Sequence, residues 1–541
     1  MTERIESLAD YQRLKQSFQW ECPEHFNFGF DVLDVWAQAQ PQRVAIRWFG
    51  PAEERTVTFS QMSVRSSQVA RAFADLGLVR GEKVLVILPR VVQWWETLVG
   101  LFKSGLVAIP GTTLLTSSDI AYRMQSSEAV AIVTDSAGAE KVDQISQELP
   151  GLKFKILVAD SSRSGWHSYE ELVGSAPADV QGGPTRSDEP ALIYFTSGTT
   201  GMPKMVLHSH ASYGIGHQVT GRFWLDLRED DLHWNISDTG WAKAAWSSLF
   251  GPWICGASLF VQHSVGKFQP ADVLKYLTEQ PITTMCAAPT IYRVLVQQDL
   301  SEFRPPALRH CVAAGEPLNP EVIATWKRAT GLTICDGYGQ TETVLLCANF
   351  PGIEIKPGSM GLPIPGIDLA IIDQQGNRLP AGEEGDIAIR IDPQRPLGLF
   401  REYWRNPQAT ATTFRNGWYV TGDCGQTDED GYFWFVGRAD DVITSSAYRI
   451  GPFEVESALI EHPAVVEAAV VGKPDPVRGQ FVKAFVVLAE GYTAGDDLHT
   501  ELQEHVKRAT APYKYPREIV FVEELPKTTS GKIRRVELRN R

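Results

Sequence analysis

One segment of the sequence is rich in groups that could hold phosphate. It reads Tyr-Phe-Thr-Ser-Gly-Thr-Thr-Gly-Met-Pro-Lys-Met-Val over residues 194–206 and begins in an apolar stretch typical of a strand. Hydroxyl and backbone N–H groups donate to phosphate oxygens, glycines let the backbone approach closely, and Lys204 adds positive charge. It is not the usual nucleotide loop, because Gly198 and Gly201 are too close together and no Ser or Thr follows Lys204. The string favours a phosphate-binding loop over a plain surface turn, with the candidate residues Thr196, Ser197, Gly198, Thr199, Thr200, Gly201 and Lys204.

Two further motifs carry groups suited to a nucleotide. Residues 336–342 read Asp-Gly-Tyr-Gly-Gln-Thr-Glu, which supplies an aromatic ring for a purine, a hydroxyl for a phosphate and a carboxylate for Mg²⁺. The alternative for this stretch is an ordinary turn with a helix cap at Thr341 and Glu342. Asp423 ends the motif Tyr-Val-Thr-Gly-Asp, and an Asp at a strand end can accept hydrogen bonds from two ribose hydroxyls. In isolation, Asp423 is better interpreted as a turn residue after a strand.

The phosphate-loop motif resembles that of the acyl-adenylate-forming enzymes, a family that includes acyl-CoA synthetases, peptide-synthetase adenylation domains and firefly luciferase. The resemblance extends over essentially the whole chain. It implies that Tyr338 stacks on adenine, that Thr341 binds the α-phosphate and that Glu342 holds Mg²⁺. It also implies that the nucleotide is bound by Gly315, Glu316, Pro317, Asp336, Gly337, Asp423, Arg438 and Arg449.

The resemblance further implies a mobile C-terminal domain that brings a lysine to the site. Asp440, within Gly-Arg-Ala-Asp-Asp, matches the family's hinge, and Lys532, within Pro-Lys-Thr-Thr-Ser-Gly-Lys, matches its adenylation lysine. A mobile lysine suits this chemistry, because it brings charge to the carboxylate and the α-phosphate only when the site closes. A charged surface linker and a basic C-terminal tail are the alternative interpretations of these two stretches.

The implied reaction has two halves. A carboxylate attacks the α-phosphate of ATP to give an acyl-adenylate and pyrophosphate, and a thiol then displaces AMP to give a thioester. An anion must approach a polyanion in the first half, so Mg²⁺ at Glu342, the loop donors and Lys532 would offset the repulsion. We therefore expect catalytic roles for Lys532, Glu342 and Thr341, and we expect the enzyme to use ATP, Mg²⁺ and CoA.

The acyl substrate can be narrowed from the same resemblance. Acetate-specific relatives carry Trp where this chain has Gly339, so a deeper pocket is expected. Residues 237–243 resemble the medium-chain acyl-CoA synthetase branch, in which a Trp matching Trp241 lies near the acyl tunnel, although plain core packing also explains that Trp. No Asp for a substrate amine can be located. A medium-chain, branched or aromatic carboxylate, as in fatty acid metabolism, is therefore expected rather than an amino acid.

One departure from the family concerns the thiol. Medium-chain relatives read Ser-Gly-Tyr-Arg where this chain reads Ser-Ala-Tyr-Arg over residues 446–449, and in acyl-CoA synthetases this segment lines the tunnel for the pantetheine arm. The methyl of Ala447, beside Tyr448, carries a cost in a narrow tunnel. CoA stays the preferred acceptor, and the alternative is a stand-alone adenylating enzyme that passes the acyl group to a carrier-protein phosphopantetheine.

Two other classes of protein fit less well. A phosphoryl-transfer NTPase or kinase would cleave ATP between the β- and γ-phosphates, whereas the implied reaction yields AMP and pyrophosphate. A non-catalytic nucleotide sensor is disfavoured because Lys532, Glu342 and Asp423 are all present.

These residues must be positioned by a chain of 541 residues, which is too long for one compact core. Strand-like runs alternate with helical patterns, such as residues 60–76, and this alternation predicts α/β sandwich subdomains. An alternating stretch at residues 386–391 predicts a small β-barrel-like region, and an α+β pattern follows from near Gly437. We expect a large N-terminal AMP- and acyl-binding domain over residues 1–437 and a small mobile catalytic domain over residues 438–541.

The composition of the chain limits the classes of partner that it can bind. The 51 Lys and Arg residues against 65 Asp and Glu give a net charge of −14, which makes general affinity for nucleic acid or anionic membranes a poor prediction. The seven scattered cysteines argue against a disulfide framework, and His208 and His210 lack a nearby third metal ligand, so both histidines are expected to be structural. The apolar run 245–261 is too short and broken for a membrane span, and the charged N-terminus has no signal core. These features predict a cytoplasmic monomer or homodimer that acts on a small-molecule acid, with no transmembrane segment.

Overall fold

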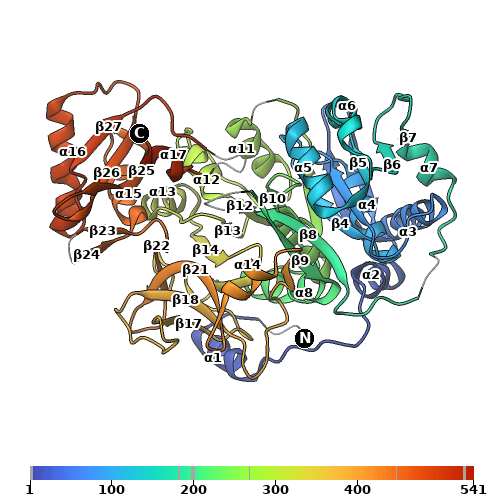
Figure 1. Ribbon diagram of the computed structural model, residues 1–541, viewed down its shortest axis with the longest axis horizontal. Coiled ribbons are helices and arrows are strands. Elements are labelled where there is room, and N and C mark those ends of the chain that lie inside the picture. The colour runs from blue at the N-terminus through green and yellow to red at the C-terminus, as the bar shows by residue number, and fades with distance from the viewer. Residues whose placement is uncertain (1–3, 181–182, 197–201, 267, 446–447, 528–531) are drawn as a thin grey trace.

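The computed structural model describes residues 4–180, 183–196, 202–266, 268–445, 448–527 and 532–541, which build four β-sheets (Figure 1). Two large, mainly parallel sheets are layered with helices, a small antiparallel sheet lies beside them, and a fourth sheet belongs to the C-terminal part of the chain. This is the α/β architecture, with a small β region and a small C-terminal α+β unit, that the sequence predicts.

The first large sheet carries the ends of the phosphate-loop segment. Its strands are parallel from β7 through β8, whereas β9 and β19 are antiparallel to their neighbours. In spatial order they are β19 (Glu402–Tyr403), β9 (Lys204–Ser209), β8 (Pro190–Thr196), β4 (Val107–Pro110), β3 (Lys83–Ile87), β5 (Ala129–Thr134), β6 (Phe154–Leu157) and β7 (His167–Ser168).

The second large sheet carries the motif at residues 336–342. Its central strands are parallel, and antiparallel strands close both edges. In spatial order they are β16 (Leu362–Pro363), β15 (Leu345–Ala348), β14 (Ile334–Gly339), β13 (His310–Ala314), β12 (Thr284–Ala287), β10 (Leu232–Ile236), β11 (Ser258–Gln262), β1 (Val44–Phe49) and β2 (Glu54–Thr58).

Helices cover both faces of each large sheet. Helices α5 (Ser117–Ser127) and α6 (Ser136–Gln144) pack on the first sheet, α3 (Phe59–Asp75) and α4 (Val92–Ser104) fill the space between the sheets, and α11 (Pro270–Glu279), α12 (Pro289–Leu295) and α13 (Pro320–Thr330) cover the second sheet. The shorter helices are α1 (Leu8–Ser17), α2 (Asp34–Ala39), α7 (Tyr169–Ser175), α8 (His210–Gly214), α9 (Ala242–Ala245), α10 (Gly251–Ile254) and α14 (Pro407–Thr412).

Helix α3 illustrates how local sequence sets an element. Thr58 caps it through a reciprocal capping box with Gln61, its apolar stripe is buried, and Gly77 follows with a φ of 94°. The helix predicted over residues 60–76 is thus confirmed within one residue at each end. The apolar run 245–261 is also buried as predicted, since it forms α10, β11 and their flanking turns.

The small antiparallel sheet supplies the strand that carries Asp423. Its strands are β17 (Leu369–Ile372), β18 (Gly385–Arg390), β20 (Phe414–Arg415), β21 (Trp418–Thr427) and β22 (Phe433–Arg438). The C-terminal sheet has β24 (Tyr448–Ile450), β23 (Ile443–Ser445), β26 (Gly479–Leu488), β25 (Val465–Asp475) and β27 (Glu518–Phe521), with α15 (Pro452–Ile460), α16 (Asp496–Ala509) and α17 (Arg535–Arg539) around it.

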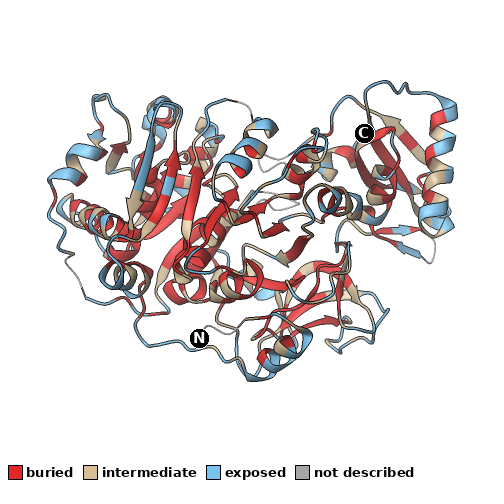
Figure 2. Cartoon of the chain, turned by 180° about the vertical axis from the view of Figure 1, so that it is seen from behind, coloured by how far each residue is buried: buried red, intermediate tan, exposed pale blue. Residues whose placement is uncertain are grey.

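The hydrophobic cores separate along the chain. Among the described residues, no core cluster mixes residues before 436 with residues after 442, and buried side chains line the sheets in each part (Figure 2). This separation is what the predicted boundary at 437/438 requires, while the exact boundary and the hinge at Asp440 stay predictions. All seven cysteines are free. In the described parts, no helix is long and apolar enough to span a membrane.

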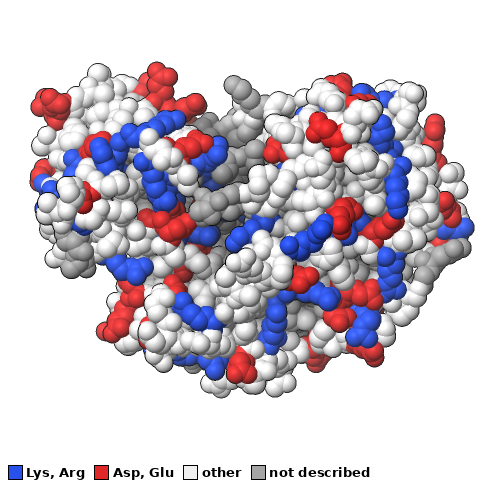
Figure 3. Space-filling view, in the orientation of Figure 1, with Lys and Arg blue, Asp and Glu red and all other residues white. Residues whose placement is uncertain are grey.

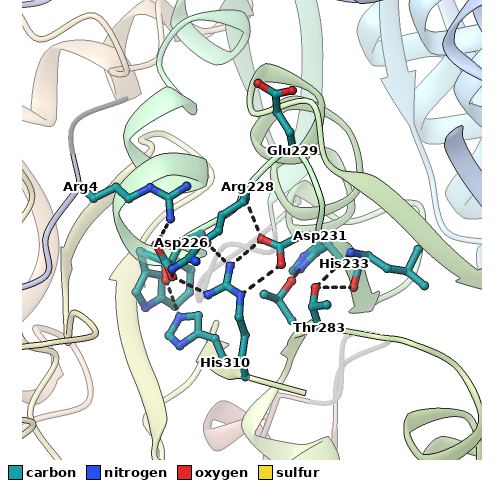
Figure 4. Close-up of polar contacts among 12 residues, drawn as sticks. Arg4, Asp226, Arg228, Glu229, Asp231, His233, Thr283 and His310 are labelled. Carbon is teal, nitrogen blue, oxygen red and sulfur yellow. Dashed lines mark hydrogen bonds and ion pairs between the residues drawn. The ribbon is translucent and has the colours of Figure 1, made fainter. Parts of the chain in front are cut away.

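A buried charge network holds the N-terminal ends of β10 and β13 together (Figure 4). Arg309 pairs with Asp226 and Asp231 at 2.5 Å each, and Asp226 also pairs with Arg4 at 3.5 Å. The next residue, His310, donates through Nε2 to the carbonyl of Trp224 at 2.7 Å. The indole of Trp224 in turn occupies the space where a Cβ on Gly337 would lie, 2.6 Å away. Through His310 and Trp224, the network therefore supports the backbone at Gly337, within the motif at residues 336–342.

Candidate active site

The ends of the phosphate-loop segment lie opposite each other on adjacent strands. Thr196 ends β8, Lys204 begins β9, and the two residues pair in antiparallel register. The Oγ1 of Thr196 donates to the carbonyl of Lys204 at 3.5 Å. The remaining predicted loop residues, Ser197, Gly198, Thr199, Thr200 and Gly201, lie outside the described residues.

Adjacent parallel strands bring two other motifs to one sheet edge. Ala314, the last residue of β13, pairs with Gly337 on β14, so the loop Gly315–Pro317 emerges beside Tyr338. The carboxyl ends of parallel strands are where α/β proteins bind ligands. The nucleotide-binding residues predicted from separate parts of the sequence thus meet in space.

Asp423 is the centre of a hydrogen-bonded cluster at this edge. Its Oδ2 accepts from the Tyr338 hydroxyl at 2.6 Å and from Nε2 of Gln340 at 2.7 Å, while Oδ1 pairs with Nε of Arg438 at 3.2 Å. Only 4% of Asp423 is exposed. Burial raises its pKa, and the charges of Arg438 and Lys532 oppose that rise. Residues from β14, β21, β22 and the C-terminal segment therefore converge on one carboxylate.

Glu342 lies in a second part of the site. Its Oε1 accepts from the Tyr403 hydroxyl at 2.8 Å, and Nζ of Lys204 lies 4.8 Å from the centroid of the Tyr403 ring. Burial raises the pKa of Glu342, while Tyr403 and Lys204 act in the opposite direction. The β19–β9 pairing places Tyr403 here, so Glu342 is linked to the phosphate-loop strand.

His208 positions the residue before Glu342. The carbonyl of Thr341 accepts from Nε2 of His208 at 2.7 Å and from the hydroxyl of Tyr213 at 2.8 Å. Burial lowers the pKa of His208 to about 3, so the ring is neutral at physiological pH. His210 is buried as well, and the described residues contain no group of three or more His, Cys, Asp or Glu side chains that could hold a metal. The interpretation of both histidines as structural stays a prediction.

Lys243 is the site residue that the sequence analysis missed. Its ammonium donates to the carbonyl of Ala314, and it lies 3.3 Å from where a Cβ on Gly315 would be. Burial lowers the pKa of Lys243, and the charge of Lys532 lowers it further. Lys532 is itself exposed and acts electrostatically on both Lys243 and Asp423. A lysine inside the apolar stretch after residue 240 is the signal that could have pointed to Lys243.

Two acidic groups surround Lys243. Glu316 accepts from Arg293 at 2.9 Å and from the backbone of Thr290 at 3.2 Å, and Lys243 is among the groups that lower the Glu316 pKa against the larger effect of burial. Burial raises the pKa of Asp336 to about 8. Asp336 accepts from the N–H of Gly337 at 3.0 Å, which fixes the start of the turn.

Other predicted residues lie apart from this cluster. Arg449 reaches Cys424 at 3.5 Å and Glu384 at 3.9 Å rather than Asp423. Tyr448 stacks on Tyr513 with 4.0 Å between ring centroids, and Ala447 lies outside the described residues.

The predicted acyl-pocket residues occupy different positions. A Cβ on Gly339 would lie 2.6 Å from the carbonyl of Val344, so this backbone has no room for a side chain. Trp241 is the half-buried residue that precedes α9. Close to Trp241 in the sequence, Trp246 packs against Trp224 with 5.7 Å between the ring centroids. A role for Trp241 in the acyl tunnel therefore stays a prediction, and plain core packing stays the alternative.

Comparisons with known proteins agree with this arrangement. Residues 33–404 match the AMP-binding enzyme family, and residues 454–532 match the AMP-binding enzyme C-terminal domain. The chain is 51% identical over 99% of its length to "Acyl-coenzyme A synthetase ACSM3, mitochondrial" of Mus musculus, of which it covers 94%. It is 52% identical to "Acyl-coenzyme A synthetase ACSM4, mitochondrial" of Rattus norvegicus over 99% of this chain and 93% of that protein.

Solved structures show the same fold. The anthranilate CoA ligase AuaEII in complex with anthranoyl-AMP superposes with a TM-score of 0.88 at 32% identity, over 96% of this chain and 97% of that one. A benzoate CoA ligase from Burkholderia xenovorans LB400 gives a TM-score of 0.84 at 28% identity, over 95% of this chain and 100% of that one.

The comparisons also correct one prediction. Both curated relatives described above are named as mitochondrial, as is "Acyl-coenzyme A synthetase ACSM5, mitochondrial" of Homo sapiens. The prediction of a cytoplasmic protein was therefore wrong. It rested on free cysteines and on the lack of an apolar signal core, and these features exclude a secretory signal only, since mitochondrial transit peptides are polar and amphipathic.

Proposed function

The chain belongs to the AMP-binding enzyme family, and from that premise we propose that it is an AMP-forming acyl-CoA synthetase of the medium-chain class. It activates a carboxylic acid with ATP and transfers the acyl group to CoA through an acyl-adenylate. The identity of about half of all residues to acyl-coenzyme A synthetases, over 99% of the chain, carries this proposal. CoA is accordingly the thiol acceptor, in preference to a carrier protein.

The cluster around Asp423 suits the adenosine half of ATP. Asp423 Oδ2 is already engaged by Tyr338 and Gln340, whereas Oδ1, which pairs with Arg438 at 3.2 Å, keeps a lone pair that can accept from a ribose hydroxyl. The charge of Arg438 lowers the pKa of this carboxyl against the larger, opposite effect of burial. Adenine would lie along the Gly315–Pro317 loop, beside the ring of Tyr338.

The first half-reaction needs positive charge at the carboxylate and the α-phosphate. We assign this to Lys532 and Lys243, which approach from the C-terminal segment and from α9 and lie close enough to affect each other's charge. Lys243 would hold the substrate carboxylate, and Lys532 would bridge it to the α-phosphate. Once the site has closed over the substrates, the two ammonium groups reduce the repulsion between the acid and ATP more than they would in water.

Glu342 fits the role of a Mg²⁺ ligand. Mg²⁺ in nucleotide sites is bound through one or two carboxylates plus substrate phosphates, and Glu342 is a carboxylate beside the phosphate-loop strand with one oxygen engaged by Tyr403. When bound, Mg²⁺ would neutralise phosphate charge. Thr341, fixed through its carbonyl by His208 and Tyr213, is placed to donate its hydroxyl to the α-phosphate.

The second half-reaction involves the other side of the C-terminal unit. Arg449, Tyr448 and Ala447 would act there once the unit has turned about Asp440. In the described state, Arg449 lies 3.9 Å from Glu384 of the N-terminal part, and this contact must break before the turn, whereas the stack of Tyr448 on Tyr513 lies within the C-terminal unit and can move with it.

Within the medium-chain class, an aromatic acid is a specific candidate. Two solved relatives at 32% and 28% identity are ligases for anthranilate and benzoate. Trp246, which is half-buried and packs on Trp224, offers a flat apolar surface for such an acid.

The experiment is carboxylate-dependent release of pyrophosphate across straight-chain, branched and aromatic acids, with AMP and thioester measured with and without CoA. Pyrophosphate and AMP formation with a CoA thioester as the product is the expected result. Cleavage to ADP and phosphate, or pyrophosphate with no thioester at any CoA concentration, would contradict the proposal.

A further inference from the structure

The short helix at the C-terminus, α17, contacts the linker on which the C-terminal unit would turn. Leu538 anchors the helix in a small core with Ala469, Val471, Phe485 and Leu525. Arg535 and Arg539, four residues apart, lie on one face of the helix. Figure 1 shows α17 beside the junction between the C-terminal unit and the rest of the chain.

Arg539 binds the first peptide beyond the predicted hinge. Its Nη2 donates to the carbonyl of Asp440 at 2.9 Å, and the same guanidinium pairs with the carboxylate of Asp441. The Asp441 side chain is only 10% exposed, so this ion pair is screened little by solvent.

Arg535 connects the same carboxylate to the core of the C-terminal unit. It pairs with Asp441 at 3.8 Å and makes a bidentate contact with Glu456, with both distances 2.8 Å. Glu456 is buried on α15 and also accepts from the backbone N–H of Val470 at 2.8 Å. Asp441 is thereby fixed to two elements of the C-terminal unit.

The linker is held just as firmly on its other side. Arg438 pairs with Asp423 at 3.2 Å, and the N–H of Ala439 donates to the carbonyl of Gly422 at 3.0 Å. Asp440 is thus the residue between the part of the linker fixed to β21 and the part fixed to α17. Its own side chain is exposed.

We propose that α17, through Arg539 and Arg535, clamps the linker beyond Asp440 to the C-terminal unit. The hinge is then confined to Asp440, and Lys532 moves in fixed register with the clamped linker. This inference rests on the proposed function, because it assumes that Lys532 serves adenylation and that the C-terminal unit turns. Lys532 lies three residues before Arg535, so the clamp and the lysine are joined by a very short stretch of chain. Arg539 and Asp441 act as positioning residues, and neither needs to contact substrate.

The turn must break the bonds that span Asp440 and leave the clamp intact. Asp441 and Val442 donate to the carbonyl of Arg438 at 2.9 and 3.1 Å, across the pivot. Asn319 of α13's N-terminus donates to Ser457 of α15 at 3.1 Å, across the two parts of the chain. These hydrogen bonds can be replaced by others during the turn, whereas the ion pairs of α17 stay formed. The C-terminal unit would then turn as a rigid body about Asp440.

The test separates the two half-reactions in Arg539→Ala and Asp441→Asn. Pyrophosphate release with acid and ATP should fall about 10- to 100-fold, because a misplaced lysine loses orientation. Thioester formation from preformed adenylate and CoA should fall less than about twofold, since that half does not use Lys532. The matched control is Arg534→Ala at the N-cap of the same helix, whose exposed partner is Glu537, and it should behave as wild type.

Further measurements distinguish positioning from folding. Arg539→Lys retains charge and should recover part of the pyrophosphate rate, and the double variant Arg539→Ala with Asp441→Asn should fall no further than either single variant. Without substrates, hydrogen exchange of Arg539→Ala should rise at residues 440–442 and stay unchanged at residues 433–438. Equal loss in both half-reactions, or unchanged exchange at residues 440–442, would overturn the clamp.

Lys532→Ala separates this inference from the proposed function. If Lys532→Ala loses pyrophosphate release while Arg539→Ala does not, the clamp is refuted and the proposed function stands. If Lys532→Ala releases pyrophosphate at the wild-type rate, the role assigned to Lys532 is refuted, and the hydrogen-exchange result still decides whether α17 restrains the linker.

Discussion

Two ammonium groups of different mobility meet at the proposed active site. Lys532 is exposed and comes from the C-terminal segment, whereas Lys243 is half-buried and bonded to the Ala314 carbonyl. We expect Lys532→Ala to reduce acid-dependent pyrophosphate release by about 100- to 1,000-fold, the size of effect seen when a preorganised charge is removed. Thioester formation from preformed adenylate should persist. Adenylate formation at the wild-type rate would remove Lys532 from the mechanism.

Lys243 is expected to act on the acid and not on ATP. Replacing it in Lys243→Met should raise KM for the carboxylic acid about tenfold, the equivalent of one charged hydrogen bond, with little change in KM for ATP. Steady-state kinetics with each substrate varied in turn measures both values. Lys275→Met, at an exposed position on α11, is the matched control. An increase confined to KM for ATP would place Lys243 at the nucleotide instead.

Asp336 makes stability depend on pH. Burial raises its folded-state pKa to about 8, well above the ordinary value for Asp near 3.9. The folded state therefore binds a proton that the unfolded state lacks between these values, and stability falls as pH rises through about 8, by up to about 1.4 kcal/mol per pH unit. Denaturant unfolding from pH 5 to pH 8 should show a smaller fall in Asp336→Asn. Asp299→Asn, at an exposed site, should keep the wild-type slope.

The residue types that carry the chemistry are visible in the sequence, but their partners are not. Tyr338, Asp423 and Arg438 are recognised because their motifs resemble those of the acyl-adenylate-forming enzymes. Lys243 was missed since a single lysine in an apolar stretch has no spacing to identify it. The contact of His208 with the Thr341 carbonyl joins residues 133 positions apart, which no local pattern encodes.

At the scale of elements, the positions of the strand ends determine which functional residues lie close together. Helix α3 and the C-terminal elements are predictable from periodicity and capping, because these signals act within a few residues. The pairing of β13 with β14, and of β19 with β9, depends on tertiary packing, and these two pairings bring Glu316 and Tyr403 into the site. The two-residue strand β19 is too short to leave any alternating pattern.

The Arg309 network is the element-scale feature most open to a stability test. Asp231 is 3% exposed and pairs at 2.5 Å with Arg309, which is 28% exposed, so Asp231→Ala leaves a half-buried guanidinium without one of its two carboxylate partners. We expect a loss of about 1–3 kcal/mol, measured as a lower denaturant midpoint. Arg228→Ala removes only an exposed ion pair of 3.7 Å to Asp226 and should cost less than about 1 kcal/mol. Equal losses would show that the network is not a buried one.

At the scale of the whole molecule, the described arrangement is the one that the proposed adenylation step requires. Lys532 lies close enough to act electrostatically on Asp423 and Lys243, while Arg449 and Tyr448 contact Glu384 and Tyr513. The face shown in Figure 3 carries interspersed charges of both signs. The contact of Asn319 with Ser457 joins the two parts of the chain in this arrangement.

Linking the two parts should separate the half-reactions. Asn319 and Ser457 bond at 3.1 Å across the junction, so Asn319→Cys with Ser457→Cys, joined by a short bis-maleimide, would lock the adenylation state. Pyrophosphate release in a single turnover should stay within about twofold of wild type, while thioester formation from preformed adenylate should fall at least about tenfold, because the unit can no longer turn. Both single-cysteine variants, treated with the same reagent and quenched before CoA is added, control for modification of native cysteines such as the exposed Cys22. Undiminished thioester formation in the cross-linked enzyme would mean that one arrangement serves both steps and that Asp440 is no hinge.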